Sequence, residues 1–488
     1  EVDWSGLRRG ARPERVALPT YPFMRERYWI DAPTPGFDQA HAPIMSAPGT
    51  GHGPAPVADR LCFHRPVWER VSDTGARVPM PASVLVLGAN DALVRALREQ
   101  APATEWRCIE AATDITGVAS AIAALAAAGD LPSAIAHVST ACDSIDAALD
   151  AGVFALHAAC RALLQDPGSG RVRIVCLRQD ADATEFHGAL AGYLASLALE
   201  NPKFAWTVLS ADPAGASAAL DPATLARTLV DELQREGGRG AEARLRAAPE
   251  AGERVREVRR MVRFDPAGPA SAGAKIKHRG VYLITGGLGG LGHVFGAHLA
   301  SRYRARLVLT GRSPLDDALR ARIAILEAQG AEVCYVRADI TDPAQVQAAV
   351  AEARRRFSRI DGVIHAAGVH DDAFALHKGR DDMAAVIAAK VHGTRHLDAA
   401  TRGDDLDLFV LFSSVSGAFG NAGQCDYAFG NAFQDAFAVR RQSRVAAGER
   451  SGATLSIGWP FWREGGMRID PADLAAAQAR TGAAPLPT

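Results

Sequence analysis

The sequence predicts an α/β protein built from two doubly wound parallel sheets. Short apolar runs alternate with alanine-rich stretches of helical pattern, once between residues 61 and 265 and again between residues 275 and 488. A cluster of glycines follows the first apolar run of the second stretch, but the first stretch has no such cluster. At 488 residues the chain is also longer than one hydrophobic core usually organises, which favours more than one domain.

Composition argues against several classes of function. Hydrophobic residues make up 48% of the chain, charged residues make up 22%, and the net charge is -1. Such a balance offers no basic surface for nucleic acid and no attraction to an anionic membrane. The seven cysteines are scattered without a Cys-x-x-Cys pair, so neither a metal site nor redox work is expected. With no leader segment and no run of about eighteen apolar residues, the sequence predicts a cytoplasmic protein.

Residues 1–60 are predicted to be a linker and a flexible connector, because they are rich in Pro, Gly, Arg and aromatic residues without periodicity. A structural domain is expected over 61–265. Its turn after the first clear strand contains one glycine, Gly88, whereas a phosphate-binding loop needs several. Buried strands are expected at 83–90, 133–139, 171–177 and 204–210, with helices at 146–164 and 189–200.

A catalytic domain is expected over 275–488, after a link rich in Gly, Ala and Pro at 266–274. The segment GVYLITGGLGGLG (280–292) runs from an apolar strand into a glycine cluster and then a helix near Leu291. Glycines allow backbone to approach a pyrophosphate, and the helix amino terminus offers it amide donors, so this is a Rossmann-like dinucleotide loop. Strands are expected at 280–285, 305–310, 332–337, 360–366, 407–413 and 453–458. The predicted cofactor contacts of this loop are Thr285, Gly286, Gly287, Leu288, Gly289, Gly290, Leu291 and Gly292.

The loops after the next three strands provide further cofactor contacts. Arg312 stands where an acidic residue would bind the ribose of NAD, and a guanidinium suits a 2′-phosphate, which favours NADPH; the alternative is a solvated arginine. Asp339 could accept from the adenine amine or cap the following helix. His365 is expected to be packed rather than catalytic. The predicted contacts here are Asp339, Ile340, Ala366, Ala367 and Gly368, the last three being small residues beside the ribose.

A serine and a tyrosine thirteen positions apart point to carbonyl reduction. In FSSVSGAFGNAGQCDYAFGNAF (412–433), a strand that ends at Ser414 and a helix that carries Tyr427 could aim both oxygens at one carbonyl. Reduction develops an alkoxide, which needs a hydrogen-bond donor and then a proton. Tyr427 supplies the proton more readily if a cation lowers its pKa from about 10, and Lys390 is the candidate. The alternatives are a packed tyrosine and a solvated lysine.

These motifs resemble the short-chain dehydrogenase/reductase superfamily, and within it the ketoreductase domains of modular polyketide synthases. The general superfamily places a lysine four residues after the tyrosine, where this chain has Asn431. Polyketide ketoreductases carry that asparagine and take the lysine from the preceding helix, which AAVIAAKVHGTRHLD matches with Lys390. The resemblance implies that Ser414, Tyr427, Lys390 and Asn431 form the catalytic tetrad.

The resemblance covers most of the chain. LPTYPFMRERYWI resembles the linker after a ketosynthase, CFHRPVWER the start of the non-catalytic subdomain, and GWPFWREGGM the entry to the substrate lid, with a lid helix expected at 473–480. The absence of an acyltransferase between linker and reductase resembles synthases whose acyltransferase acts in trans. The family normally continues into a last helix and strand, so the chain is expected to be cut before them. The implied cofactor is NADPH, and the implied partners are a phosphopantetheinylated acyl carrier protein and a neighbouring ketosynthase.

The resemblance also bears on stereochemistry. An Asp in a Leu-Asp-Asp-like motif accompanies 3R hydroxyls in this family, and the segment 370–372, His-Asp-Asp, matches except at its first position. Asp372 is therefore the predicted stereocontrol residue, and the alternative is a solvated loop. The other class has Trp eight residues before Tyr, where this chain has Phe419, although Gln424 is often seen in that class. Phe429 stands where Pro marks an epimerising subtype, so no epimerisation is expected.

The predicted function is NADPH-dependent reduction of a carrier-bound β-ketoacyl thioester to a 3R (D) β-hydroxyacyl thioester in polyketide biosynthesis. Two alternatives stay open. A degenerate reductase kept as a scaffold would be expected to lose Tyr427 or the glycines, yet both are present. A free-standing short-chain dehydrogenase would not need the linker and the additional domain.

Overall fold

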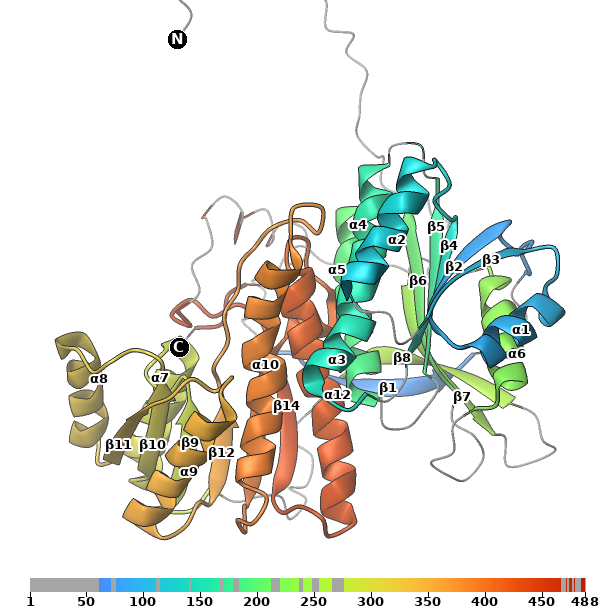
Figure 1. The fold of residues 1–488 in the computed structure, drawn as a ribbon. Coiled ribbons are helices and arrows are strands. Elements are labelled where there is room, and N and C mark those ends of the chain that lie inside the picture. Colours follow the sequence, from blue (N-terminus) through green and yellow to red (C-terminus); the bar gives the residue numbers. More distant parts are fainter. Residues whose placement is uncertain are drawn as a thin grey trace, which may run out of the picture. The chain divides into compact units, whose positions relative to one another are not determined.

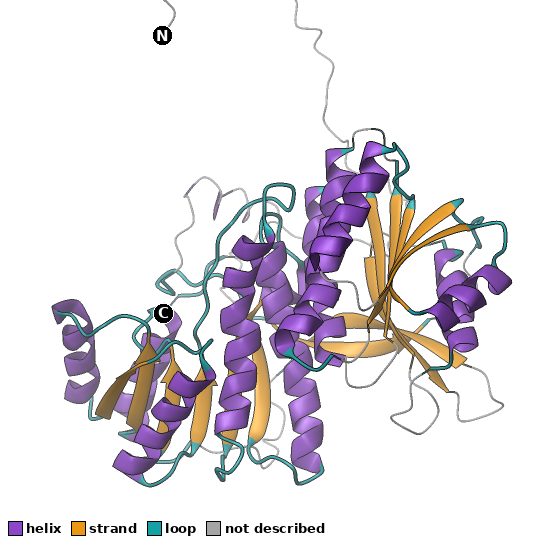
Figure 2. Ribbon diagram, viewed as in Figure 1, coloured by secondary structure: helices purple, strands orange, loops and turns teal. Residues whose placement is uncertain are grey.

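The computed structural model describes residues 61–466 and parts of 471–487. Short stretches are left out within 72–75, 111–114, 140–141, 167–169, 179–183, 212–219, 237–239, 248–253 and 266–275. The predicted linker at 1–60, the link at 266–274 and most of the predicted lid helix at 473–480 therefore lie outside the described residues. Two sheets with helices on their faces make up the described part (Figures 1 and 2).

Six parallel strands form the sheet of the second half, in the order β11-β10-β9-β12-β13-β14. Each strand begins and ends within two residues of its predicted bounds, because a buried parallel strand reads as a continuous apolar run. The order reverses between β9 and β12, and doubly wound sheets bind ligands at such a switch point. The strands are β9 Val281–Thr285, β10 Arg306–Gly311, β11 Glu332–Arg337, β12 Gly362–His365, β13 Leu408–Ser414 and β14 Ala453–Trp459.

Two helices of this half begin at capping residues that can be recognised in the sequence. Asp316 and Asp342 cap α8 and α9 by accepting hydrogen bonds from backbone N–H groups of the first turn, and Pro343 follows the second cap. Helix α7 differs, because its cap residue Gly289 brings no side chain to the helix start. The helices are α7 Gly290–Tyr303, α8 Asp317–Ala328, α9 Pro343–Phe357, α10 Arg380–Ala400, α11 Val415–Phe419 and α12 Cys425–Ala446.

Eight strands form the sheet of the first half, in the order β1-β8-β7-β6-β5-β4-β2-β3. The four predicted strands correspond to β2, β4, β5 and β6. The sequence analysis missed the other four, and β1 and β8 pair antiparallel with Arg-rich sequences that lack a continuous apolar run. The strands are β1 Phe63–Arg70, β2 Ser83–Ala89, β3 Glu105–Glu110, β4 Ala134–Ser139, β5 Val172–Arg178, β6 Phe204–Ala211, β7 Gly240–Ala247 and β8 Arg254–Phe264.

The first half carries one helical run, Ile145–Gln165, that is long and apolar enough to cross a membrane by length and composition. Half of its apolar window is buried inside the protein. Val153 and Leu156 have no exposed surface, so the run has the character of a core helix. The helical segments of this half are α1 Asp91–Gln100, α2 Ile115–Ala127, α3 Ile145–Leu149, the π-helical η3 Asp150–Phe154, α4 Ala155–Gln165, α5 Thr184–Glu200 and α6 Pro222–Leu233.

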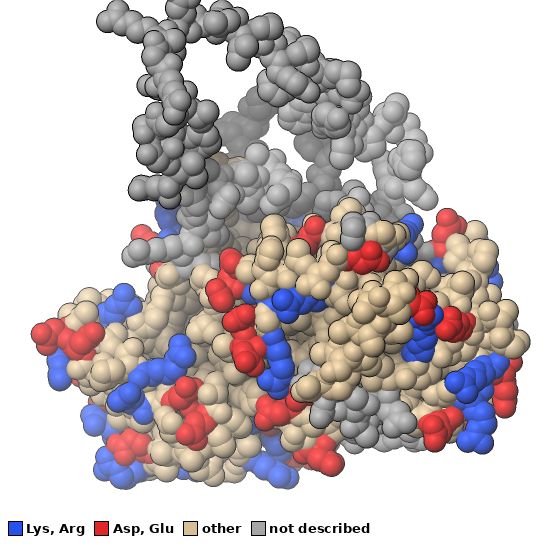
Figure 3. All heavy atoms as spheres, turned by 45° about the horizontal axis from the view of Figure 1, so that its top comes forward, with Lys and Arg blue, Asp and Glu red and all other residues tan. Residues whose placement is uncertain are grey.

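Charged side chains of both signs are interspersed on the face shown in Figure 3. This pattern accords with the net charge of -1. The visible face therefore offers no single-sign surface of the kind that binds nucleic acid.

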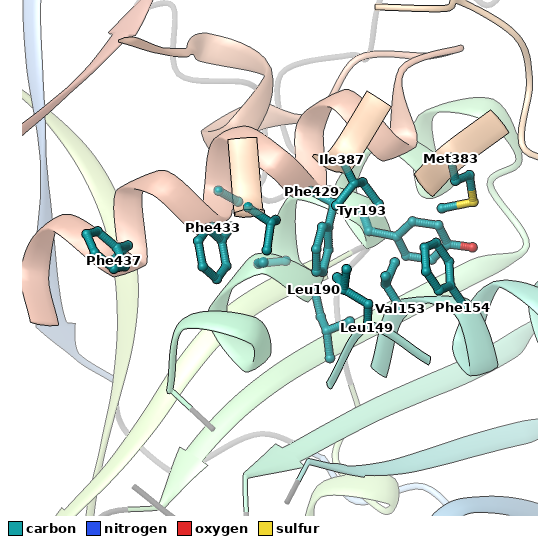
Figure 4. Close-up of a cluster of buried hydrophobic side chains, with 14 of the residues drawn as sticks. Leu149, Val153, Phe154, Leu190, Tyr193, Met383, Ile387, Phe429, Phe433 and Phe437 are labelled. Atoms are coloured by element: carbon teal, nitrogen blue, oxygen red, sulfur yellow. The ribbon is translucent and has the colours of Figure 1, made fainter. Parts of the chain in front are cut away.

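Helices α5 and α12 join the two halves through a close backbone contact. A Cβ at Gly192 would lie 2.5 Å from the carbonyl oxygen of Ala428, so the two helices approach to a distance that only glycine permits. The rings of Phe186 and Phe433 meet nearby with centroids 5.1 Å apart. Figure 4 shows side chains of both halves in the same apolar cluster, which is one continuous core. The labelled members include Leu149, Val153, Phe154, Leu190 and Tyr193 from the first half and Met383, Ile387, Phe429, Phe433 and Phe437 from the second.

We expect Gly192→Ala to lower the free energy of unfolding by about 2 kcal/mol, because the added methyl group meets backbone that cannot move aside. Urea denaturation followed by circular dichroism measures the change. The matched control is Gly152→Ala in η3, where a Cβ would have no neighbour within 4 Å and no loss is expected. Equal stability of the two variants would contradict the close contact.

Candidate active site

Ser414 and Tyr427 meet at the carboxyl edge of the second sheet. Ser414 is the last residue of β13, and its hydroxyl accepts a hydrogen bond from the Ser416 N–H at 3.2 Å. Tyr427 lies in the first turn of α12. Burial raises the pKa of Tyr427, and the side chains of Asn431 and Ser414 partly offset that rise by interacting with the phenol. The phenol therefore keeps its proton at neutral pH, as a proton donor must.

Asn431 lies one turn after Tyr427 and carries an unused acceptor. Its Nδ2 donates to the Tyr427 carbonyl at 2.8 Å, and its own backbone carbonyl accepts from the Ser413 hydroxyl at 3.1 Å. Its Oδ1 is buried and has no hydrogen-bond partner among the described residues. A buried acceptor in that state usually binds water or a ligand. This atom is therefore available to bind a water or a ligand beside Tyr427.

Lys390 is buried on α10, with 3% of its surface exposed, so it is not a solvated helix-surface lysine. Its Nζ donates to the carbonyl oxygen of Phe412, and burial lowers its pKa to about 8. Gly368 and Gly430 make room for its stem, since a Cβ at either would lie 3.0 Å from it. The side chains that offset the rise in the pKa of Tyr427 are those of Asn431 and Ser414, and the expected effect of Lys390 on that pKa stays a prediction.

The glycine loop is shaped by positions where a side chain does not fit. Gly286 has φ +63°, and a Cβ there would lie 3.0 Å from Ala367. A Cβ at Gly292 would lie 2.3 Å from the Gly286 carbonyl oxygen, which closes the turn tightly. No side chain caps the start of α7, and an uncapped helix amino terminus is where a pyrophosphate can bind. The Gly465 carbonyl lies against Gly290 and bounds this site.

The corresponding turn of the first sheet is built differently. Gly88 has φ +79°, and a Cβ there would lie 2.4 Å from the Val138 carbonyl oxygen. The Asn90 side chain then caps α1 by accepting from the Leu93 N–H at 2.9 Å. The chain thus fills this helix start itself, in agreement with the prediction that the first domain lacks a nucleotide loop.

Thr285 and His365 fix the loops on either side of the switch point. The Thr285 hydroxyl bonds His365 Nδ1 at 2.7 Å and accepts from the Ala367 N–H at 3.3 Å. His365 Nε2 bonds the Ala389 carbonyl oxygen at 3.1 Å. Burial lowers the pKa of His365 to about 3, so the imidazole is neutral and structural, as expected. The small segment 366–368 therefore passes directly beside the glycine loop.

Arg312 is exposed at the carboxyl end of β10, and its carbonyl accepts from Arg337 Nε at 2.9 Å. Two arginine residues thus lie at this edge, and the Arg337 guanidinium bonds the backbone of Arg312. Asp339 Oδ1 accepts from the N–H and the hydroxyl of Thr341, while Asp342 caps α9. The capping role considered for Asp339 is therefore wrong, and its adenine contact stays a prediction. Ile340, the remaining predicted contact, is buried against Gly393.

Asp372 is bound to the segment that precedes Tyr427. The amide Nδ2 of Asn421 donates to Gln424 Oε1 at 3.0 Å, and Gln424 Nε2 donates to both oxygens of Asp372 at 2.9 and 3.0 Å. Asp372 is thus hydrogen-bonded to Gln424 although its side chain is 54% exposed, and its role in stereocontrol stays a prediction. The two residues that the sequence analysis weighed for opposite stereochemical classes form one unit.

The sequence analysis missed a buried ion pair beside the tyrosine. Lys378 Nζ lies 2.6 Å from Asp426 Oδ2, and each side chain is 1% exposed. The other oxygen of Asp426 accepts from the Tyr427 N–H at 2.8 Å, and Lys378 also donates to the Asp371 carbonyl. The signal available was the rarity of lysine, which occurs at five positions in the whole chain.

The comparisons with known proteins agree with this geometry. Residues 280–464 match the KR domain family. The chain is 28% identical to a ketoreductase domain from the bacillaene assembly line, with a TM-score of 0.66 over 87% of this chain and 91% of that one. This chain belongs to the ketoreductases of modular polyketide synthases. A-type ketoreductases from a modular polyketide synthase are also 28% identical to this ketoreductase, with a TM-score of 0.68 over 87% and 88% of the two chains. The predicted family and two-sheet fold are confirmed.

Curated relatives extend the comparison. The ketoreductase is 38% identical over 411 residues to polyketide synthase ThaG of Burkholderia thailandensis, which covers 81% of this chain and 7% of that synthase. It is 43% identical over 213 residues to polyketide synthase PksL of Bacillus subtilis, covering 43% of this chain and 5% of the synthase. The chain thus spans a small fraction of the length of these relatives. The predicted trans-acyltransferase type agrees with PksL and its relatives PksM and PksN, which are synthases of that type.

We expect kcat/KM for carbonyl reduction to fall as pH rises through about 8. Burial lowers the pKa of Lys390 to about 8, so the lysine is cationic below that pH and neutral above it. Steady-state measurements of kcat/KM as a function of pH, made for the wild type and for Lys390→Met, check this expectation. The variant should lose the step near pH 8, whereas the control Lys277→Met, at a lysine paired with Asp361 and Asp407, should keep it. A Lys390→Met profile that still falls near pH 8 would exclude Lys390 as its source.

Proposed function

We propose that this ketoreductase uses NADPH to reduce a β-ketoacyl thioester on an acyl carrier protein to the β-hydroxyacyl thioester. The observation that carries the proposal is the meeting of Ser414, Tyr427 and Asn431 at the carboxyl edge, with the buried Lys390 behind them and the glycine loop beside them.

The tetrad residues divide the work of proton transfer. The Ser414 hydroxyl and the Tyr427 phenol hold the substrate carbonyl oxygen, and the phenol gives up its proton as negative charge develops there. A reduced nicotinamide, when bound, supplies the two electrons and the hydrogen that the carbonyl carbon gains. The unpaired Oδ1 of Asn431 holds a water that returns a proton to Tyr427, and Lys390 supplies the cation that favours this return.

The loops at the carboxyl edge of the second sheet carry groups that suit each part of NADPH. The amides of the segment 286–292 hold the pyrophosphate, Asp339 accepts from the adenine, and the segment 366–368 lies against the ribose. Arg312 and Arg337 hold the 2′-phosphate, because two guanidinium groups at the end of β10 and β11 attract its charge. Arg312, with Arg337 beside it, is what favours NADPH over NADH in this proposal.

We further propose that the product has the 3R (D) configuration. Asp372 and Gln424 together form one wall of the substrate site. Phe419 occupies the position eight residues before Tyr427, where the class with the opposite configuration has Trp. Phe429 is buried in the shared core, where a proline would interrupt α12, so no epimerisation is proposed. Chiral chromatography of the reduced product tests the assignment, and a 3S product would overturn it.

The setting proposed for the ketoreductase is a cytoplasmic assembly line. Its partners are a phosphopantetheinylated carrier protein and neighbouring domains such as a ketosynthase, as the family implies. Within the chain, residues 1–60 are proposed as the post-ketosynthase linker, 61–265 as the structural subdomain and 275–488 as the catalytic subdomain. The similarity to multidomain synthases such as ThaG supports this arrangement.

We expect Tyr427→Phe to lower kcat by at least about 100-fold, because the variant keeps the ring and loses the proton donor. NADPH oxidation at 340 nm with a β-ketoacyl N-acetylcysteamine thioester measures the rate. The matched control is Tyr303→Phe at the end of α7, remote from the predicted tetrad, which should leave kcat unchanged. Absence of turnover in the folded wild-type protein would instead support the scaffold alternative, and equal rates would remove Tyr427 from the chemistry.

We expect Arg312→Ala to raise KM for NADPH about tenfold and to leave KM for NADH nearly unchanged, because only NADPH carries the 2′-phosphate. Steady-state kinetics with both cofactors give the two ratios. Arg302→Ala, which removes an exposed arginine from the last turn of α7, is the control. A parallel rise of both KM values in Arg312→Ala would mean that the guanidinium does not bind the phosphate.

A further inference from the structure

The last residue of α5 reaches from the first half of the chain to two loops of the active site. The Glu200 carboxylate accepts hydrogen bonds from the Ala375 N–H at 2.7 Å and from the Gly423 N–H at 2.9 Å. Ala375 follows Asp372 on the loop between β12 and α10. Gly423 precedes Gln424 on the loop between α11 and α12. One carboxylate therefore bridges the two loops that carry the Asp372 and Gln424 pair.

The helix that carries Glu200 also seats the second loop directly. One turn earlier, the Ser196 hydroxyl accepts from the Asn421 N–H at 3.0 Å. Gly420 has φ +72°, and a Cβ there would lie 2.6 Å from the backbone of Ala195 and Ser196. The segment between Gly420 and Gly423 is thus held by the end of α5 rather than by the second sheet.

The neighbouring helix α4 holds the far end of the first loop. His157 Nε2 bonds the Lys378 carbonyl oxygen at 3.1 Å, and Arg161 Nε donates to the Leu376 carbonyl oxygen at 3.1 Å. Lys378 in turn forms the buried ion pair with Asp426, immediately before Tyr427. The first half of the chain therefore contacts the loop that carries Asp372 at Ala375, Leu376 and Lys378.

The two loops are also joined directly by hydrogen bonds, which lie beside the bridge that Glu200 forms. The Ala373 N–H donates to the Gly423 carbonyl oxygen at 3.0 Å, and Gln424 donates to Asp372. Glu200 accepts from both loops beside these contacts with a charged group, and hydrogen bonds to a carboxylate are about twice as strong as neutral ones. Burial raises the pKa of Glu200, and the two amide donors and the Lys378 charge oppose that rise by stabilising the carboxylate.

We propose that Glu200 is a positioning residue for carbonyl reduction. By holding the Asp372 loop and the Gln424 loop at a fixed separation, it sets the face of the substrate that is presented to Tyr427. The proposal rests on the proposed function and assigns to the subdomain without a nucleotide loop a part in stereochemical outcome. The packing of the two halves against each other does not depend on Glu200, since the Gly192 contact and the Phe186–Phe433 pair lie earlier in α5.

The test compares Glu200→Gln with Glu99→Gln in the full chain. Glutamine keeps the shape of the side chain but replaces one acceptor oxygen with an NH2 group that cannot accept from an amide. Glu99 is an exposed carboxylate on α1 of the same subdomain and serves as the matched control. For each protein, kcat, KM and the ratio of 3R to 3S product are measured with a β-ketoacyl N-acetylcysteamine thioester. Hydrogen–deuterium exchange of peptides covering 371–376 and 421–425 is measured without substrate or cofactor.

For Glu200→Gln we expect kcat to fall about tenfold, the minor stereoisomer to increase several-fold, and both loops to exchange faster, with thermal stability near that of the wild type. Glu99→Gln should behave as the wild type in every measurement. A wild-type kcat and stereoisomer ratio in Glu200→Gln would overturn the positioning role, even if the variant melts at a lower temperature.

The hydrogen–deuterium exchange measurement separates failure of the proposed reductase function from failure of the Glu200 bridge between the two loops. If the wild-type protein shows no turnover, the proposed function fails, but faster exchange of both loops in Glu200→Gln still supports the bridge between them. If exchange in both loops is unchanged by Glu200→Gln, the bridge itself is wrong, whatever the rate of reduction.

Discussion

The contact between α5 and α12 is the constraint on which the rest of the structure depends. Helix α12 carries Tyr427 and Asn431, and its position fixes the proton donor relative to the sheet edge. Helix α5 lies against it at a distance set by Gly192, with aromatic rings packed beside the contact. The same core cluster contains residues of both halves, so the active-site helix is a shared element rather than the property of one sheet.

Burial controls the electrostatics of the site more than pairing does. It raises the pKa of Tyr427, lowers the pKa of Lys390 to about 8 and lowers that of His365 to about 3. Each shift favours the neutral form of the group. Tyr427 therefore keeps its proton as a donor. The neutral His365 acts as a structural link, through its hydrogen bonds to Thr285 and the Ala389 carbonyl.

The sequence could predict those elements of the fold that a short local pattern of residues determines. The six strands of the second sheet and the glycine loop were found because buried parallel strands and phosphate loops have continuous, short-range signals. The Arg-rich strands β1 and β8 gave no such signal. Glu200 and Gly423 are 223 positions apart, so no periodicity could connect them, and the Lys378–Asp426 pair could not be inferred before the loops were placed. The effect assigned to Lys390 on the pKa of Tyr427 stays a prediction, and the sequence did not show how strongly burial acts on both groups.

The hydrogen bonds from α4 and α5 to the active-site loops have a consequence for recombination between synthases. The first sheet has lost the turn that would bind a nucleotide, yet its helices contact the loop ends at Leu376, Lys378 and Gly423. A chimera that joined this catalytic half to a foreign partner would lose the hydrogen-bond partners of those loops, namely Arg161, His157 and Glu200. The smallest exchangeable unit that preserves this active site is therefore the pair of sheets with their shared core.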